Sequence, residues 1–165
     1  MFLTPYLYAQ HKEYSPTVAD YEEKIQYFES VKKDIFDHKT WEKIILESKY
    51  EKKEINFNQM SDLDKQLFCF TMGNRTLNAL LRIEQLWQEE LKKFDNPNHK
   101  LINSKESRPA TKNEVKSYLD KIIIMRKNFA QDFDKFNQNF FSKYKNDLTP
   151  EEINSYNIKV QNAKK

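Results

Sequence analysis

The chain has 165 residues, 38% of them apolar and 32% charged, and its 28 Lys and Arg against 25 Asp and Glu leave a formal net charge of +3. This length is typical of one domain, and the nearly balanced charge argues against a polycationic tail. The single glycine, Gly73, argues against β-hairpin-rich, Rossmann and P-loop folds, because their tight turns and phosphate-binding loops depend on glycine.

The first element in chain order is an extended N-terminal arm over residues 1–14. It contains Tyr6, Tyr8 and Tyr14 at irregular spacing, and we expect it either to pack on the rest of the protein or to reach a neighbouring molecule. Its apolar start lacks the basic leading region and the small-residue cleavage site of a signal peptide. Residues 15–165 are expected to form one helical bundle domain.

Two helices are predicted in the next part of the chain. Ser15 and Pro16 fit an N-cap followed by proline in the first turn, and this helix is expected to run to about Asp37. Its apolar residues recur at three- and four-residue spacing: Val18, Tyr21, Ile25, Phe28, Val31 and Ile35. Thr40 is the expected N-cap of a second, shorter helix. The inward-facing residues of that helix are Trp41, Ile44 and Ile45.

A long third helix is predicted over residues 62–94, where Ser61 and Asp64 resemble a capping box. One apolar stripe consists of Leu63, Leu67, Phe70, Leu77, Leu81, Trp87 and Leu91. A second stripe on the far side of the helix consists of Phe68, Met72, Ala79, Ile83 and Leu86. A helix that is apolar on two faces is buried on both, so it is either the central helix of the bundle or a helix covered by another protein. Gly73 lies in its middle, where glycine permits a kink.

After a polar loop over residues 95–110, a fourth helix is predicted over 112–146. It starts with the capping box of Thr111 and Glu114. Its apolar residues follow the four-three alternation of a heptad seam, in which Arg126 takes one position. They are Val115, Leu119, Ile122, Phe129, Phe133, Phe136 and Phe140. A last helix begins at Thr149 and Pro150, with Ile153, Tyr156 and Val160 on one side.

These elements predict an all-α protein. We expect a single helical bundle of about five helices, with two long antiparallel helices over about 62–94 and 112–146. No uncharged stretch is long enough for a membrane span, and the lone Cys69 forms no intramolecular disulfide. We therefore expect an intracellular and most simply cytoplasmic protein, although a processed organellar protein fits the same sequence.

Chemistry-bearing residues are scattered along the chain. His11, His38 and His99 stand apart from one another, and no metal-ligand motif includes them. Cys69 is flanked by Phe68 and Phe70, which favours a small buried hydrophobic residue over a catalytic nucleophile. The sequence therefore predicts no catalytic, cofactor or metal site, and no cofactor is expected.

Polar residues interrupt the apolar stripes at three positions, namely Asn74, Glu84 and Arg126. Burial without a partner is costly for such groups. We therefore expect Glu84 of the third helix to pair with Arg126 of the fourth helix and to fix the register of the two helices.

The segment from Lys105 to Lys127 contains seven Lys and Arg against three Asp and Glu, a local excess of four basic residues. Lys112, Lys116 and Lys121 are candidate phosphate contacts if the protein associates with nucleic acid. We favour the simpler interpretation that these lysines lie on a solvated helix face.

The leading functional hypothesis is a non-enzymatic protein–protein interaction protein, an accessory or structural subunit or an adaptor of a larger complex. Aromatic residues dominate interface hot spots, so the candidate partner contacts are Phe140, Phe141 and Tyr144, together with Tyr6 and Tyr8 of the arm. Burial of both Phe140 and Phe141 inside the chain would end that assignment. The alternatives are a weakly basic nucleic-acid-associated protein and a small helical enzyme whose site the sequence does not show.

Overall fold

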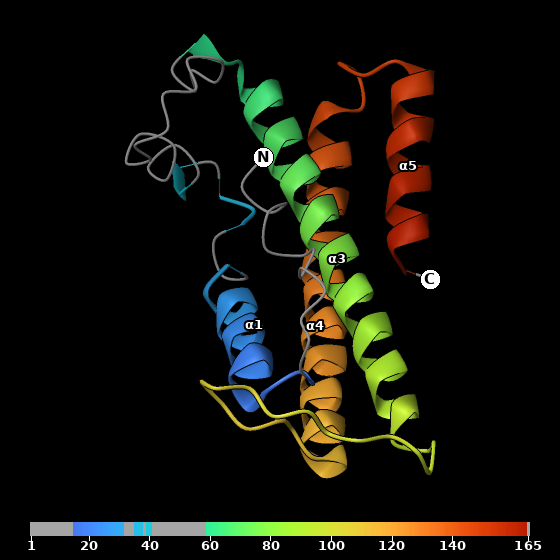
Figure 1. Cartoon of the computed structure of the whole chain (residues 1–165). Helices are drawn as coiled ribbons and strands as arrows, with labels where there is room; N and C mark the ends of the chain where they lie inside the picture. The colour runs from blue at the N-terminus through green and yellow to red at the C-terminus, as the bar shows by residue number, and fades with distance from the viewer. Residues whose placement is uncertain (1–14, 32–34, 38, 41–58, 165) are drawn as a thin grey trace.

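The computed structural model describes residues 15–31, 35–37, 39–40 and 59–164, with residues 159–164 described as backbone only. This part of the chain is all-α and contains four helices instead of the expected five or so. The helices are α1 (Val18–Val31), α3 (Asp62–Lys93), α4 (Lys112–Tyr144) and α5 (Pro150–Lys164) (Figure 1). The helix expected after Thr40 falls mostly on residues 41–58, which lie outside the described residues, as do residues 1–14.

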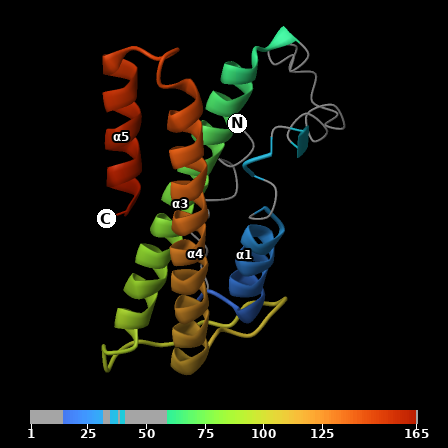
Figure 2. The same ribbon diagram turned by 180° about the vertical axis from the view of Figure 1, so that it is seen from behind.

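The two long helices form an antiparallel pair that runs the whole length of the described bundle (Figures 1 and 2). We call the line along which α3 and α4 meet the α3–α4 seam. At about 1.5 Å per residue, α3 and α4 are about 48 and 50 Å long. The helices α1 and α5 are about 21 and 22 Å long. Figure 1 shows α1 packed beside one half of the long pair and α5 beside the other half, on the opposite side.

The ends of the long helices follow the capping residues in the sequence. Ser61 accepts a hydrogen bond from the backbone N–H of Asp64 (3.1 Å) at the start of α3. At the start of α4, the Thr111 hydroxyl accepts from the Glu114 N–H (3.4 Å), and the Glu114 carboxylate accepts from the Thr111 N–H (2.9 Å). These bonds satisfy backbone donors that the first turn leaves free. Both long helices end within two residues of their predicted C-termini.

The loop over residues 95–110 ties the start of α1 to the start of α4. The N–H of Ser15 donates to the carbonyl of Ile102 (3.1 Å), and the N–H of Ala110 donates to the carbonyl of Pro16 (3.1 Å). An isolated antiparallel bridge joins Thr17 to Pro109. The long polar loop is therefore fixed by these bonds to the residues at the start of α1. The described residues include no β-strand.

The first helix is shorter than the sequence predicts. It is described over Val18–Val31 and does not reach Asp37, because Ile35 and Phe36 lie in a turn. The turn directs the ring of Phe36 onto α4, where it stacks on Phe129 and Phe136 at centroid distances of 5.4 and 5.0 Å. Ile35 is buried although it lies in the turn and not in the helix. The apolar spacing in the sequence therefore extends beyond the helix itself.

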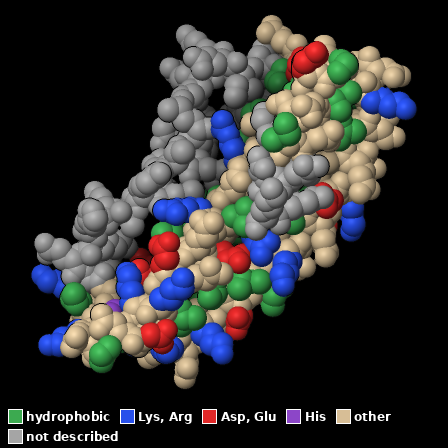
Figure 3. All heavy atoms as spheres, turned by 90° about the vertical axis from the view of Figure 1, so that its right-hand side faces the viewer, with side chains coloured by type: hydrophobic (Ala, Val, Ile, Leu, Met, Phe, Trp, Pro, Cys, Tyr) green, Lys and Arg blue, Asp and Glu red, His purple; other side chains and the backbone are tan. Residues whose placement is uncertain are grey.

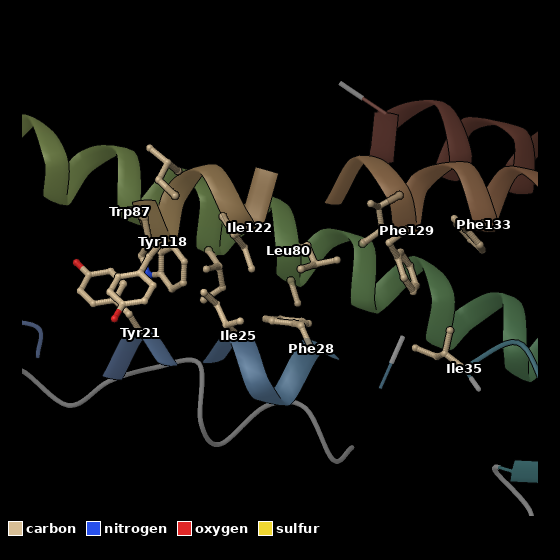
Figure 4. Packing of buried hydrophobic residues seen from close by; sticks show 14 of the residues in the cluster. Tyr21, Ile25, Phe28, Ile35, Leu80, Trp87, Tyr118, Ile122, Phe129 and Phe133 are labelled. Carbon is tan, nitrogen blue, oxygen red and sulfur yellow. The ribbon is translucent and has the colours of Figure 1, made fainter. Parts of the chain in front are cut away.

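Two groups of buried side chains form the core. The main cluster lies between α1, α3 and α4, where the rings of Tyr21 and Tyr118 stack at 5.1 Å and Trp87 lies edge-on to Tyr21 at 4.8 Å (Figure 4). A smaller cluster lies at the far end of α4. Its buried members are Phe140, Tyr144 and Leu148.

Gly73 does not interrupt α3, which is one continuous helix. A β-carbon at this position would lie 2.7 Å from Cε2 of Phe133 and 2.8 Å from Cε1 of Phe36. Glycine is therefore needed for the close approach of two aromatic rings and not for a kink.

Candidate functional site

Glu84 and Arg126 are brought together across the α3–α4 seam. The Nε of Arg126 donates a hydrogen bond to Oε2 of Glu84, and the two side chains are 17% and 14% exposed, respectively. The Nε2 of Gln88 donates to the other Glu84 oxygen at 3.4 Å. A charge-assisted bond in this partly buried setting is stronger than one on the surface. It also joins one position of α3 to one position of α4, as the interrupted stripes predict.

Half-buried apolar residues surround this ion pair. Leu81 precedes Glu84 by three residues, and all four residues Leu81, Glu84, Ile123 and Ala130 are half-buried. Ile123 and Ala130 lie three residues before and four residues after Arg126, so helical spacing places them beside it. We call Leu81, Glu84, Ile123, Arg126 and Ala130 the open half of the seam.

The open half lies beyond the C-terminal end of α5, which stops about halfway along α3 (Figure 1). Figure 3 looks onto the side of the molecule that carries α3 and α5, and it shows apolar side chains interspersed with Lys, Arg, Asp and Glu. No helix among the described residues continues over this part of the seam.

The other half of the seam is covered by α5 through Tyr156. Its ring lies edge-on to Phe70 of α3 at a centroid distance of 5.0 Å. The same ring lies 6.3 Å from both Phe140 and Phe141 of α4. This end of the seam is therefore an aromatic contact of three helices.

Two of the three expected partner contacts at this end, Phe140 and Tyr144, are buried within the chain, whereas Phe141 is half-buried and stays a prediction. Phe140 and Tyr144 are only 3% and 7% exposed, because α5 folds back over the end of α4 and covers them, and Phe141 is half-buried in the same cluster. Phe140 and Tyr144 therefore serve the core of this chain. Tyr6 and Tyr8 lie outside the described residues.

Some polar side chains are buried here without hydrogen-bond partners. Within the described structure these groups are Oδ1 of Asn74, Oγ1 of Thr76, both amide atoms of Asn137 and the Tyr144 hydroxyl. Asn137, 4% exposed, was not singled out from the sequence. The signal was available, because Asn137 follows Phe133 by four residues and precedes Phe140 by three, the spacing of one buried helix face.

The three candidate phosphate-binding lysines are not gathered on one face. Lys112 Nζ pairs with Asp95 at 2.7 Å, and Lys121 Nζ lies 5.5 Å from the centroid of the Tyr118 ring. Lys112 and Lys121 are nine residues apart, about two and a half helical turns, so they lie on opposite sides of α4. Lys116 is exposed on α4. The arrangement provides no converging set of cations.

Cys69 is fully buried on α3. Burial raises the pKa of its thiol to about 12, with a smaller contribution from the charge of Asp37. The thiol therefore stays protonated and unreactive at neutral pH. Among the described residues, no three His, Cys, Asp or Glu side chains are placed to hold a metal ion together.

Comparison with known proteins adds no relative to this picture. No protein-family model matches the chain, and no curated protein or solved structure is significantly similar to it. None of the described helices combines the length and the apolar character needed to cross a membrane.

Proposed function

We propose that the chain is a non-enzymatic interaction protein, an accessory subunit or adaptor of a larger complex, which contacts its partner through the open half of the seam. The observation that carries this proposal is the difference in length between α5 and the long helices. The long helices extend for about 48 to 50 Å, and α5 covers about 22 Å of that length. More than half of this face of the seam is left without a described helix over it.

The composition of the open half supports a protein partner. Apolar side chains of Leu81, Ile123 and Ala130 are half-buried around the Glu84–Arg126 pair, so partly exposed apolar surface encloses an ion pair that is already satisfied within the chain. Exposed polar residues follow on either side, including Gln85 of α3 and Lys127 of α4. Apolar surface bounded by a polar rim is typical of protein–protein interfaces.

The positions of the lysines favour a protein over a nucleic acid as the partner. Nucleic-acid binding of this weakly basic chain would rely on several cations that meet phosphates together. Lys112 is already paired with Asp95, and Lys121 lies against Tyr118 on a different side of α4. No converging cationic surface is therefore part of the proposal.

Native mass spectrometry of the protein isolated from its own source, with and without nuclease treatment, tests this function. We expect a complex of defined stoichiometry whose mass does not change with nuclease. A complex that nuclease dissolves would favour nucleic-acid association instead. A bare monomer in both preparations would contradict a role as a subunit.

A further inference from the structure

The face of the long helices that α5 covers continues, at the same angle around each helix, into the open half of the seam. Leu81 follows Leu63 by 18 residues, and Ile123 precedes Phe141 by 18 residues. Because 18 residues make five full turns of an α-helix, each pair points to the same side of its helix. Leu63 and Phe141 pack in the terminal cluster that also contains Tyr156 of α5. Leu81 and Ile123 therefore repeat, further along the seam, the positions beside which α5 packs.

The packing of α5 shows how a helix lies on this face. Tyr156 contacts both long helices at once, with ring-centroid distances of 5.0 Å to Phe70 of α3 and 6.3 Å to Phe141 of α4. The helix α5 stops about halfway along α3, and Leu81 lies beyond the midpoint of α3 (Figure 1). From Leu81 to Lys93 the face is about 20 Å long, enough for nearly four turns of another helix.

Three exposed lysines lie at the ends of this apolar face. Lys116 and Lys127 are seven residues before and four residues after Ile123, within about 40° of it around α4. Lys92 is eleven residues after Leu81, within about 20° of it around α3. Because the long helices are antiparallel, Lys92 near the end of α3 lies at the same end of the bundle as Lys116 near the start of α4. We call these three lysines the lysine rim.

Nearby acidic groups leave the lysine rim with an excess of positive charge. Two of them are already neutralised within the chain, because Glu84 pairs with Arg126 and Asp95 pairs with Lys112. Asp120 is the exposed carboxylate that the described residues place beside the open face. The lysine rim therefore outnumbers it three to one, and a positively charged rim favours a partner of the opposite sign.

We propose that the open half of the seam binds an amphipathic helix of a partner protein whose apolar stripe is flanked by Asp or Glu. This inference rests on the proposed interaction function and names the chemistry of the partner. The apolar stripe packs on Leu81, Ile123 and Ala130. Carboxylates of the partner meet the lysine rim at two levels, near Lys127 and near Lys116, which are about 16 Å apart along α4. The partner's carboxylates are therefore about three helical turns apart.

The spacing of the lysine rim favours acidic side chains of a protein over a nucleic acid. The apolar side chain of Ile123 lies between Lys127 and Lys116, and a phosphate backbone would leave it uncovered. An amphipathic helix covers the apolar face and meets the lysines at the same time.

Binding of designed peptides to the full chain tests the chemistry of the partner. The probe is a fluorescent helical peptide of about 17 residues, with leucines at three- and four-residue spacing and glutamates on both sides of the leucine stripe. The matched peptide has lysine in place of each glutamate. In fluorescence anisotropy at low ionic strength, we expect the glutamate peptide to bind at least about tenfold more tightly, because the lysine rim attracts one peptide and repels the other.

Charge reversal on the protein should invert this preference. The rim-reversed variant combines Lys92→Glu, Lys116→Glu and Lys127→Glu, and it should bind the lysine peptide more tightly than the glutamate peptide. The control variant makes the same change in net charge at exposed lysines elsewhere, with Lys105→Glu, Lys121→Glu and Lys135→Glu. It should keep the preference for the glutamate peptide. All six positions are exposed, so both variants should retain the helical circular dichroism of the unmodified chain.

Several results would overturn this inference. They are absence of binding by the glutamate peptide, equal affinity for both peptides, and a preference that the rim-reversed variant leaves unchanged. A single-stranded oligonucleotide that binds the unmodified chain more tightly than the glutamate peptide would assign the lysine rim to phosphates instead. A dimer of the purified chain in native mass spectrometry that the rim-reversed variant loses would assign the face to a second copy. None of these measurements uses the complex from the source organism, so the proposed function stands or falls by its own test.

Discussion

The ring of Phe133 on α4 occupies the space in which a β-carbon of Gly73 on α3 would lie, only 2.7 Å from that position. Gly73 is fully within the core and within a continuous helix. Its backbone and the ring of Phe133 therefore set how closely the two long helices approach each other.

Gly73→Ala should destabilise the protein, although alanine favours an isolated helix by about 1 kcal/mol. The added methyl group must displace two packed rings, and overpacking of this kind costs about 1–3 kcal/mol. Urea denaturation measures the change in the free energy of unfolding. Asn78→Ala, at an exposed position of the same helix, is the control and should be neutral or slightly stabilising. A stabilised Gly73→Ala variant would contradict the close approach.

The Glu84–Arg126 pair should show coupling in a double-mutant cycle. Arg126→Met leaves the partly buried Glu84 carboxylate without its partner, and we expect a loss of about 2 kcal/mol in the free energy of unfolding. The double variant with Glu84→Leu should recover part of that loss. In the control, Lys112→Met removes an exposed pair with Asp95 and should cost less than about 0.5 kcal/mol. Strictly additive effects of the Glu84 and Arg126 substitutions would show that the pair contributes nothing.

The Glu114 cap should lose its contribution in acid. Hydrogen bonds from Arg108 and then from Thr111 lower the pKa of Glu114 from 4.5 to about 2. A lowered folded-state pKa means that this stabilisation is complete above pH 4.5 or so and is lost as the pH falls towards 2. NMR titration of the Glu114 carboxyl carbon measures the pKa directly. In Arg108→Met the pKa should move back towards 4.5, and an unchanged pKa would rule out Arg108 as the main cause.

Cys69 should report on opening of the core. Its thiol is fully buried, and burial raises its pKa to about 12, so both access and ionisation oppose its reaction. Reaction with a disulfide reagent at pH 7 should be at least about a thousandfold slower than that of a free cysteine peptide. The rate should approach that of the peptide in concentrated urea. Rapid labelling of the folded chain would show that α3 is more accessible than its packing indicates.

The sequence predicts the long helices well because their information is local. The Thr111 and Glu114 capping box marks the start of α4 within a few residues, and the heptad spacing identifies the buried face. The Glu84–Arg126 contact follows from two polar interruptions in facing stripes. Such patterns carry the helix periodicity and the capping chemistry directly.

The parts that the sequence did not predict depend on contacts between distant segments. Phe140 and Tyr144 fit an exposed aromatic end of α4 until α5 folds back over them. Gly73 suggests a kink until Phe133 and Phe36 are placed against it. The spacing of Asn137 to Phe133 and Phe140 predicts its burial, but its lack of a hydrogen-bond partner depends on which side chains of other segments lie around it.

A comparison of two adjacent variants tests the proposed interaction most directly. Ile123→Arg places a charge on the open half of the seam, and Ile124→Arg changes the neighbouring residue, which is 58% exposed and points about 100° away around α4. Native mass spectrometry of each variant, expressed in the source organism, should show the complex with Ile124→Arg and its loss with Ile123→Arg, while both remain folded by circular dichroism. An intact complex with Ile123→Arg would contradict a partner contact at the open half of the seam.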